Sequence, residues 1–225
     1  MYLYIETDGE VYLVEKQGKL TLPDEKDKLP FEVKEVYINN FPEGEVRICS
    51  PILDKHPTDW YSKVEIPVTD NVSNVAKRAV NFSLPRIVSE LIITNIEGKV
   101  LMTKNARGLV EGKWKLPGGF ISFPENPSEI MIREIQEELG VEIQLGELLG
   151  IYNSVKKYPQ LFMVCMMYHA KLKSEDFKIN KDEISEVAWM DIDEAIQKTN
   201  IEFNKLGLQD FKNVGVAQPG RAPRS

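Results

Sequence analysis

Residues 119–141, GFISFPENPSEIMIREIQEELGV, constrain the local structure more than any other part of the chain. Gly140 is placed to end a helix in a left-handed conformation, and the residues before it predict a helix from about Pro127 to Leu139. Residues advance about 100° each along a helix, so one side carries the apolar residues and another the glutamates. The apolar side is expected to contain Met131, Ile132, Ile135 and Leu139.

The glutamates of this helix are Glu134, Glu137 and Glu138. Spacings of three and four residues bring such side chains to about 5–6 Å at their Cβ atoms. Repulsion at that distance is on the order of a few kcal/mol at an effective dielectric constant of about 20. A divalent cation that prefers oxygen ligands, Mg²⁺ or Mn²⁺, would relieve it. The alternative is a solvated helix face in which Arg133 is an ordinary partner of Glu137.

The residues around the helix favour the cation site. Gly118 and Gly119 let the backbone adopt positive φ and approach a ligand closely. Glu125 precedes the helix, where its carboxylate can meet the positive end of the helix dipole or reach back to Arg133. These features make a bound ligand a better interpretation than an ordinary charged helix surface.

The spacing of the fixed residues resembles the Nudix box, the signature of the Nudix hydrolases. Those residues are Gly119, Glu125, Arg133, Glu134, Glu137, Glu138 and Gly140. The resemblance implies a pyrophosphohydrolase that cleaves a nucleoside diphosphate linked to another group. It also implies that Glu134, Glu137 and Glu138 hold Mg²⁺ or Mn²⁺, and that Arg133 orients Glu125 and the helix carboxylates. The general base is then Glu138 or a glutamate outside the box, for which Glu183 is the candidate.

The segments on either side of the box agree with this resemblance. IVSELIITN and KVLMTKN are apolar runs around a turn, which predicts a β-hairpin, and LLGIYNS and LFMVCMMYHAKL read as strands. DEISEVAWMDIDEAIQ predicts a strand followed by a helix. The resemblance covers about residues 86–200 and implies an α+β fold, an α-β-α sandwich with a mixed β-sheet, in a domain of residues 86–212.

Residues 1–84 are expected to form a small β-rich N-terminal domain. Apolar and polar residues alternate around Asp8-Gly9, a strong hairpin signal. A linker or short helix is expected near residues 71–83. Residues 213–225 contain little apolar surface, so we expect a flexible tail there. The position of the first domain is similar to that of N-terminal domains that help some Nudix enzymes to dimerise, so a homodimer is one expectation.

Charge and composition bear on the partner. The net charge is −7, which is a poor basis for nucleic-acid binding. Positive residues nevertheless gather before the box, and we expect them, with Gly118 and Gly119, to contact a small nucleotide substrate. They are Lys104, Arg107, Lys113 and Lys115. Neither a signal peptide nor a membrane span is recognised, and Cys49 and Cys165 are too few for a zinc site. We therefore expect a cytoplasmic enzyme without nucleic-acid or membrane partners.

A weaker similarity bears on the substrate. LPRIVSELIITN and LPGGFIS resemble the NADH pyrophosphatase branch. That branch also carries a zinc ribbon and a motif after the box, and this sequence has neither the zinc cysteines nor that motif. Ser122 and Pro124 also depart from the common pattern of the box. ADP-ribose or a dinucleotide is the preferred substrate, with a nucleoside triphosphate as the alternative. A non-catalytic nucleotide-binding module, a transcription regulator and an isopentenyl-diphosphate isomerase are the competing classes. A transcription regulator would need a DNA-binding module after the fold, and the isomerase would need a cysteine near the box; the sequence shows neither.

Overall fold

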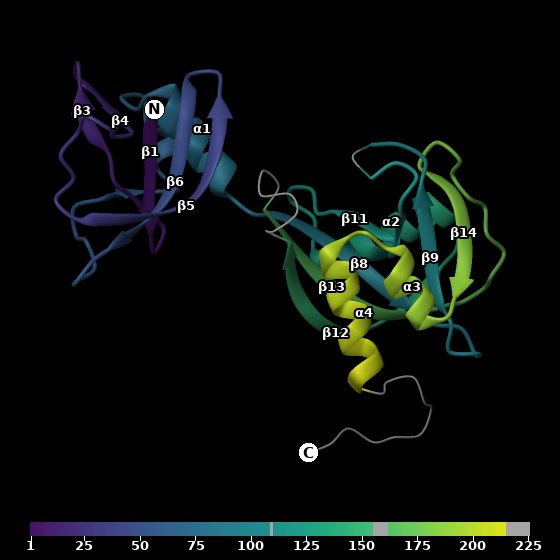
Figure 1. The fold of residues 1–225 in the computed structure, drawn as a ribbon. Helices are drawn as coiled ribbons and strands as arrows, with labels where there is room; N and C mark the ends of the chain where they lie inside the picture. Colours follow the sequence, from purple (N-terminus) through teal and green to yellow (C-terminus); the bar gives the residue numbers. More distant parts are fainter. Residues whose placement is uncertain (109, 155–161, 215–225) are drawn as a thin grey trace. The chain divides into compact units, whose positions relative to one another are not determined.

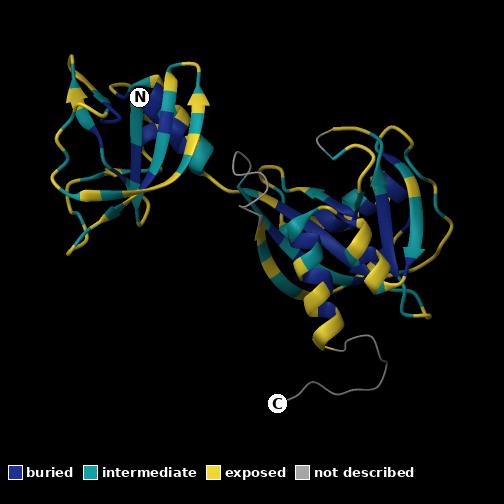
Figure 2. Cartoon of the chain, viewed as in Figure 1, coloured by how far each residue is buried: buried dark blue, intermediate teal, exposed yellow. Residues whose placement is uncertain are grey.

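A computed structural model describes residues 1–108, 110–154 and 162–214. The chain divides into two compact units, Met1–Pro85 and Arg86–Ser225. Each unit has its own sheets and helices (Figure 1) and its own buried apolar residues (Figure 2). The predicted tail, residues 213–225, lies outside the described residues from residue 215 onward.

The first unit is built on a five-stranded sheet with the order β5-β6-β1-β2-β7, beside a small β3-β4 hairpin. Its elements are β1 (Tyr2–Thr7), β2 (Glu10–Val11), β3 (Val14–Lys16), β4 (Lys19–Thr21), β5 (Glu32–Phe41), β6 (Gly44–Ile52), β7 (Tyr61–Ser62), a 3₁₀ turn (Ile66–Val68) and α1 (Asn74–Ser83). Asp8 and Gly9 have φ of 48° and 81° between the antiparallel strands β1 and β2. Positive φ at both turn residues suits the twist of a two-residue hairpin, which confirms the hairpin prediction.

The segment before residue 84 is a packed helix rather than a linker. Ser73 caps α1 by accepting a hydrogen bond from the amide of Ala76. Val75, Ala76, Ala79 and Val80 recur every three or four residues and are buried in the same cluster as Tyr4 and Val46. Burial of such a stripe is what stabilises a short helix in water. α1 therefore belongs to the first unit.

The second unit contains two sheets, β11-β8-β13-β12 and β10-β9-β14. Its elements are β8 (Arg86–Ile93), β9 (Val100–Asn105), β10 (Trp114–Lys115), β11 (Gly118–Phe120), α2 (Pro127–Leu139), β12 (Ile143–Ser154), β13 (Met163–Leu172), β14 (Ile184–Met190), α3 (Ile192–Lys198) and α4 (Glu202–Val214). The first sheet is mixed, because β13 runs parallel to β8 and the other pairs are antiparallel. Among the described residues, every helix is too short or too polar to cross a membrane.

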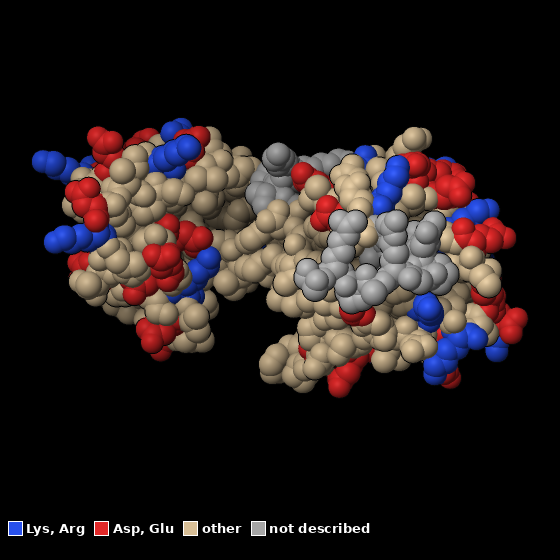
Figure 3. All heavy atoms as spheres, turned by 90° about the horizontal axis from the view of Figure 1, so that it is seen from below, with Lys and Arg blue, Asp and Glu red and all other residues tan. Residues whose placement is uncertain are grey.

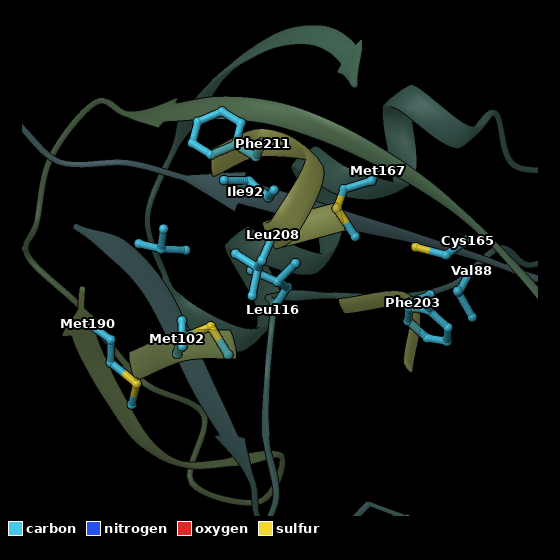
Figure 4. Packing of buried hydrophobic residues seen from close by; sticks show 12 residues of the cluster. Val88, Ile92, Met102, Leu116, Cys165, Met167, Met190, Phe203, Leu208 and Phe211 are labelled. Atoms are coloured by element: carbon cyan, nitrogen blue, oxygen red, sulfur yellow. The ribbon is translucent and has the colours of Figure 1, made fainter. Parts of the chain in front are cut away.

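Side chains of β8 are buried on both faces of its sheet. Val88 and Ile92 lie in one cluster with Phe203, Leu208 and Phe211 of α4 (Figure 4). Leu91 and Ile93 lie in the other, and its α2 members are Ile130, Met131, Ile135 and Leu139. Successive side chains of a strand point to opposite faces, so α2 and α4 cover opposite sides. This is the α-β-α sandwich that the sequence predicted, and each fully buried Leu, Ile or Phe stabilises it by about 1.5–3 kcal/mol.

The predicted β8–β9 hairpin is wrong beyond its turn. The turn itself is present, since the Asn95 side chain accepts hydrogen bonds from the amides of Glu97 and Lys99. The pairing between the two segments is an isolated bridge, Thr94↔Val100. β8 then pairs with β11 and β13, and β9 pairs with β10 and β14. Strands that come later in the sequence pair with both edges of β8 and of β9, so the two cannot pair with each other along their length. The local sequence does not show which of these pairings forms.

Candidate active site

The central element of the site is α2, which runs from Pro127 to Leu139 as predicted. Asn126 accepts a hydrogen bond from the amide of Ser128 at its start, and Gly140, with φ of 67°, ends it. One part of the predicted apolar side differs, because Ile132 is 51% exposed. Ile130 takes its place among the buried residues. Ile132 lies about 100° around the axis from Met131, enough to move it to the edge of the buried stripe.

Arg133 joins the acidic residues of the site. Its Nε is 2.8 Å from Glu125 Oε1, and its Nη2 is 3.0 Å from Glu134 Oε1. Its Nη1 is 2.6 Å from Glu137 Oε2. The hydrogen bonds from Arg133 hold the pKa of the Glu125 carboxyl below its ordinary value. The sequence left open whether Glu125 meets the positive end of the helix dipole or reaches back to Arg133, and in the structure it contacts Arg133.

Glu134 lies directly against the backbone of Gly119. A Cβ atom at position 119 would lie 2.6 Å from the carboxyl carbon of Glu134, much closer than carbon atoms can approach. Burial raises the pKa of Glu134, and the negative charge of Glu138 raises it further. The glycine therefore makes room for a carboxylate that lies beside a second one.

Glu138 forms a buried ion pair with Lys115. Both side chains are 8% exposed, and Nζ of Lys115 is 3.4 Å from Glu138 Oε1. The same Nζ donates a hydrogen bond of 2.7 Å to the carbonyl of Gly118. Burial raises the pKa of Glu138, and the charge of Lys115 opposes that rise. Glu138 Oε2 is buried and has no hydrogen-bond partner within the described part of the chain.

These carboxylates fit a divalent cation in part. Glu134 and Glu138 lie one turn apart on α2, and the charge of Glu138 contributes to the raised pKa of Glu134. An unpartnered buried oxygen such as Glu138 Oε2 is a good cation ligand. Glu137 is 53% exposed and contacts Arg133 instead. Within residues 1–108, 110–154 and 162–214, no three acidic, His or Cys side chains come together as a metal site. The structure thus brings two of the three expected ligands together, and Glu137 would have to leave Arg133 to join them.

The positive residues before the box do not form one surface cluster. Lys104 Nζ is 2.6 Å from Glu186 Oε1, and Arg107 Nη2 is 2.5 Å from Glu183 Oε1. Lys115 is buried beside Glu138, because its short strand β10 pairs with β9 inside the fold. Lys115 was expected to contact the substrate, and this stays a prediction for a side chain that the fold buries. Arg107 is 68% exposed and remains accessible to an anion.

Glu183 approaches the site through backbone contacts with the end of α2. The amides of Lys178 and Asn180 donate to the carbonyls of Leu139 and Glu138, at 2.8 and 2.9 Å. The amide of Glu183 donates to the Asn180 carbonyl at 3.1 Å. The charge of Glu183 contributes to the raised pKa of Glu138. A residue far from the box in sequence thus acts electrostatically on it.

Two buried polar residues near the site were not identified from the sequence. Glu90 of β8 is 4% exposed, and burial raises the pKa of its carboxyl to about 8. It lies opposite Gly118 in the β8–β11 pair. Asn204 of α4 is fully buried and donates a hydrogen bond to the Glu90 carboxylate. An acid within the apolar run IVSELIITN was a usable signal for Glu90, whereas a single Asn in a helix gave none.

The second unit is thus an α-β-α sandwich that presents an acidic helix to a Gly-Gly strand. The family model of the NUDIX domain matches residues 84–210, more than half of the chain. The chain belongs to this family. Its N-terminal 83 residues lie outside the match.

Several known proteins are similar to this chain over about half of its length or somewhat more. Nudix hydrolase 8 of Arabidopsis thaliana is 30% identical over 118 residues, which are 51% of this chain and 30% of that protein. The ADP-ribose pyrophosphatase of Methanocaldococcus jannaschii is 28% identical over 115 residues, 51% and 66% of the two chains. The NAD-capped RNA hydrolase NudC of Pseudomonas aeruginosa is 26% identical over 138 residues, 60% and 48% of the two. The chain therefore spans less than two thirds of the length of each relative.

Solved structures support the fold. The MutT protein of Methanosarcina mazei superposes with a TM-score of 0.52 and 21% identity, over 60% of this chain and 98% of that one. A NUDIX hydrolase of Nitrosomonas europaea superposes with a TM-score of 0.51 and 22% identity, over 58% of this chain and 90% of that one. At such identities the likeness concerns the fold alone.

Proposed function

We propose that the chain is a pyrophosphohydrolase that needs Mg²⁺ or Mn²⁺ and cleaves a nucleoside diphosphate linked to another group. The observation that carries this proposal is the pair Glu134 and Glu138, one turn apart on α2, with Glu134 against the backbone of Gly119. Membership of the NUDIX domain family supports it. Two enclosed carboxylates of like charge are costly to keep ionised without a cation or a positive partner.

Glu134 and Glu138 would hold the cation, and Glu137 would join them by turning away from Arg133. When bound, the cation polarises phosphoryl oxygens and lowers the pKa of water. Arg133 supports the site by fixing Glu125 and Glu134, with which it forms contacts of 2.8 and 3.0 Å. Burial raises the pKa of Glu138, and Lys115 opposes that rise because a positive charge nearby favours the carboxylate.

The general base is Glu138 or Glu183. Glu138 is buried and has a raised pKa, which makes its carboxylate a better proton acceptor than an exposed one. Glu183 is less buried, at 31% exposure of its side chain, and is paired with Arg107. A substrate phosphate could attract Arg107 and leave Glu183 free to accept a proton. Comparing Glu138→Gln with Glu183→Gln in single-turnover rates would separate the two.

ADP-ribose or a dinucleotide is the preferred substrate. One relative is named an ADP-ribose pyrophosphatase and another an NAD-capped RNA hydrolase, and both names describe compounds with a diphosphate bridge. On the face of each unit that Figure 3 displays, Lys and Arg are interspersed with Asp and Glu, and the net charge is −7. This mixed charge favours a small anion over a nucleic acid. A nucleoside triphosphate is the second candidate substrate.

A substrate panel with Mg²⁺ or Mn²⁺ tests the proposal. ADP-ribose, a dinucleotide, a nucleoside triphosphate and NAD-capped RNA should be compared, with products identified by mass. Cleavage at a diphosphate bridge is expected, and Glu138→Gln or Glu137→Gln should lower kcat by about a hundred-fold or more without unfolding the protein. Exposed Glu129→Gln on the same helix is the matched control. Full activity of either site variant, or activity in excess EDTA, contradicts the metal assignment.

A further inference from the structure

Asn204 is a buried polar residue between apolar neighbours of α4. It is 0% exposed, and Phe203 and Leu208 of the same helix belong to the core. Its Oδ1 accepts a hydrogen bond of 2.9 Å from the amide of Leu116 and one of 3.4 Å from the Thr199 hydroxyl. Its Nδ2 donates to the Glu90 carboxylate. Burying an amide side chain costs free energy unless its donors and acceptors form hydrogen bonds. In Asn204 both the oxygen and the nitrogen of the side chain form them.

The amide of Leu116 is one residue away from the buried ion pair of the site. Lys115 precedes it, and Nζ of Lys115 contacts both the Gly118 carbonyl and Glu138 Oε1. Gly118 packs directly against the backbone of β8, since a Cβ there would lie 2.2 Å from the Ser89 carbonyl oxygen. Asn204 therefore holds the backbone of a segment whose side chain reaches α2 on the opposite face of the sheet.

Glu90 determines which way the Asn204 amide points. Its carboxyl oxygen accepts the hydrogen bond from Nδ2, so Oδ1 must face the Leu116 amide. The site thus needs a donor toward Glu90 and an acceptor toward Leu116 at the same position. An asparagine supplies both, whereas an ionised aspartate supplies only acceptors and places a second buried carboxyl group beside that of Glu90.

We propose that Asn204 and Glu90 are positioning residues of the hydrolase site: from α4 and β8 they fix Leu116, and so hold Lys115 against Glu138. This inference rests on the proposed function. Residues that hold a ligand's neighbour in place commonly contribute about ten-fold to a hundred-fold to metal affinity or activity. Through Asn204, α4 then supports the hydrolase site as well as the core.

Asn204→Asp and the double change Glu90→Gln with Asn204→Asp form the central comparison. The single change should lower kcat by about ten-fold or more, with KM changed by less than about three-fold, and should weaken Mn²⁺ binding measured by calorimetry by about ten-fold. The double change restores a donor and an acceptor with their positions exchanged. It should recover kcat and Mn²⁺ affinity to within about three-fold of the unchanged protein.

Phe211→Leu is the control for stability, because Phe211 lies in the same core cluster on α4. It should lower the melting temperature while kcat stays unchanged. The inference is overturned if Asn204→Asp keeps full kcat and Mn²⁺ affinity, if the double change recovers neither, or if Phe211→Leu lowers kcat as much. Absence of any hydrolysis by the unchanged protein would instead contradict the proposed function, and Mn²⁺ affinity would still test the positioning role.

Discussion

Glu90→Gln should remove a pH dependence from the stability of the second unit. Burial raises the pKa of Glu90 from 4.5 to about 8. Between these values the folded state keeps a proton that the unfolded state has lost. The free energy of unfolding therefore falls as the pH rises through this window, and it levels off above about pH 8.

The size of the effect follows from the proton difference. One proton changes the free energy of unfolding by about 1.4 kcal/mol per pH unit when the two states differ fully. From pH 6 to pH 8 the expected loss is about 2 kcal/mol, reduced from the full slope because Glu90 is half ionised near pH 8. For a unit of this size, that corresponds to a melting temperature lower by about 4–8 °C.

Unfolding by heat and by urea at pH 6, 7 and 8 in EDTA would measure this, with Glu129→Gln as an exposed control. His169 titrates with the opposite sign, because burial lowers its pKa and stability then rises with pH. Both proteins contain His169, so the difference between the two pH curves isolates Glu90. Parallel curves for the unchanged protein and Glu90→Gln would refute the reasoning.

Three further predictions concern the site and the units. Gly119→Ala should lower kcat by about ten-fold or more with little loss of stability, because the added Cβ displaces Glu134; steady-state rates and melting curves check this, and an unchanged kcat contradicts it. Arg107→Ala should mainly raise KM if its exposed guanidinium contributes uniform substrate binding, as the sequence predicts; a fall in kcat alone would argue for a role in the chemical step. Limited proteolysis should cut between Leu84 and Arg86, after the packed helix α1 and between the two units, and cleavage within residues 74–83 would show that α1 is not held in the core.

The helix of the box could be predicted from sequence because its determinants are local. Gly140 ends α2, the apolar spacing sets its buried side, and Arg133 lies within one turn of Glu134 and Glu137. These interactions span a few residues, so the helical period alone brings them together. Ile132 was the exception, because it lies at the edge of the buried stripe and is 51% exposed.

Tertiary structure alone decided the environment of Lys115. In the sequence it belongs to a group of positive residues before the box, and strand pairing buries it between Gly118 and Glu138. The contact from Asn204 to Leu116 joins residues that are 88 positions apart. Propensity and periodicity describe which face of an element is apolar, but not which elements meet. The carboxylates of the site follow from the sequence, whereas the buried charges and hydrogen bonds that hold them depend on the closure of the sandwich, which removes water and fixes their partners.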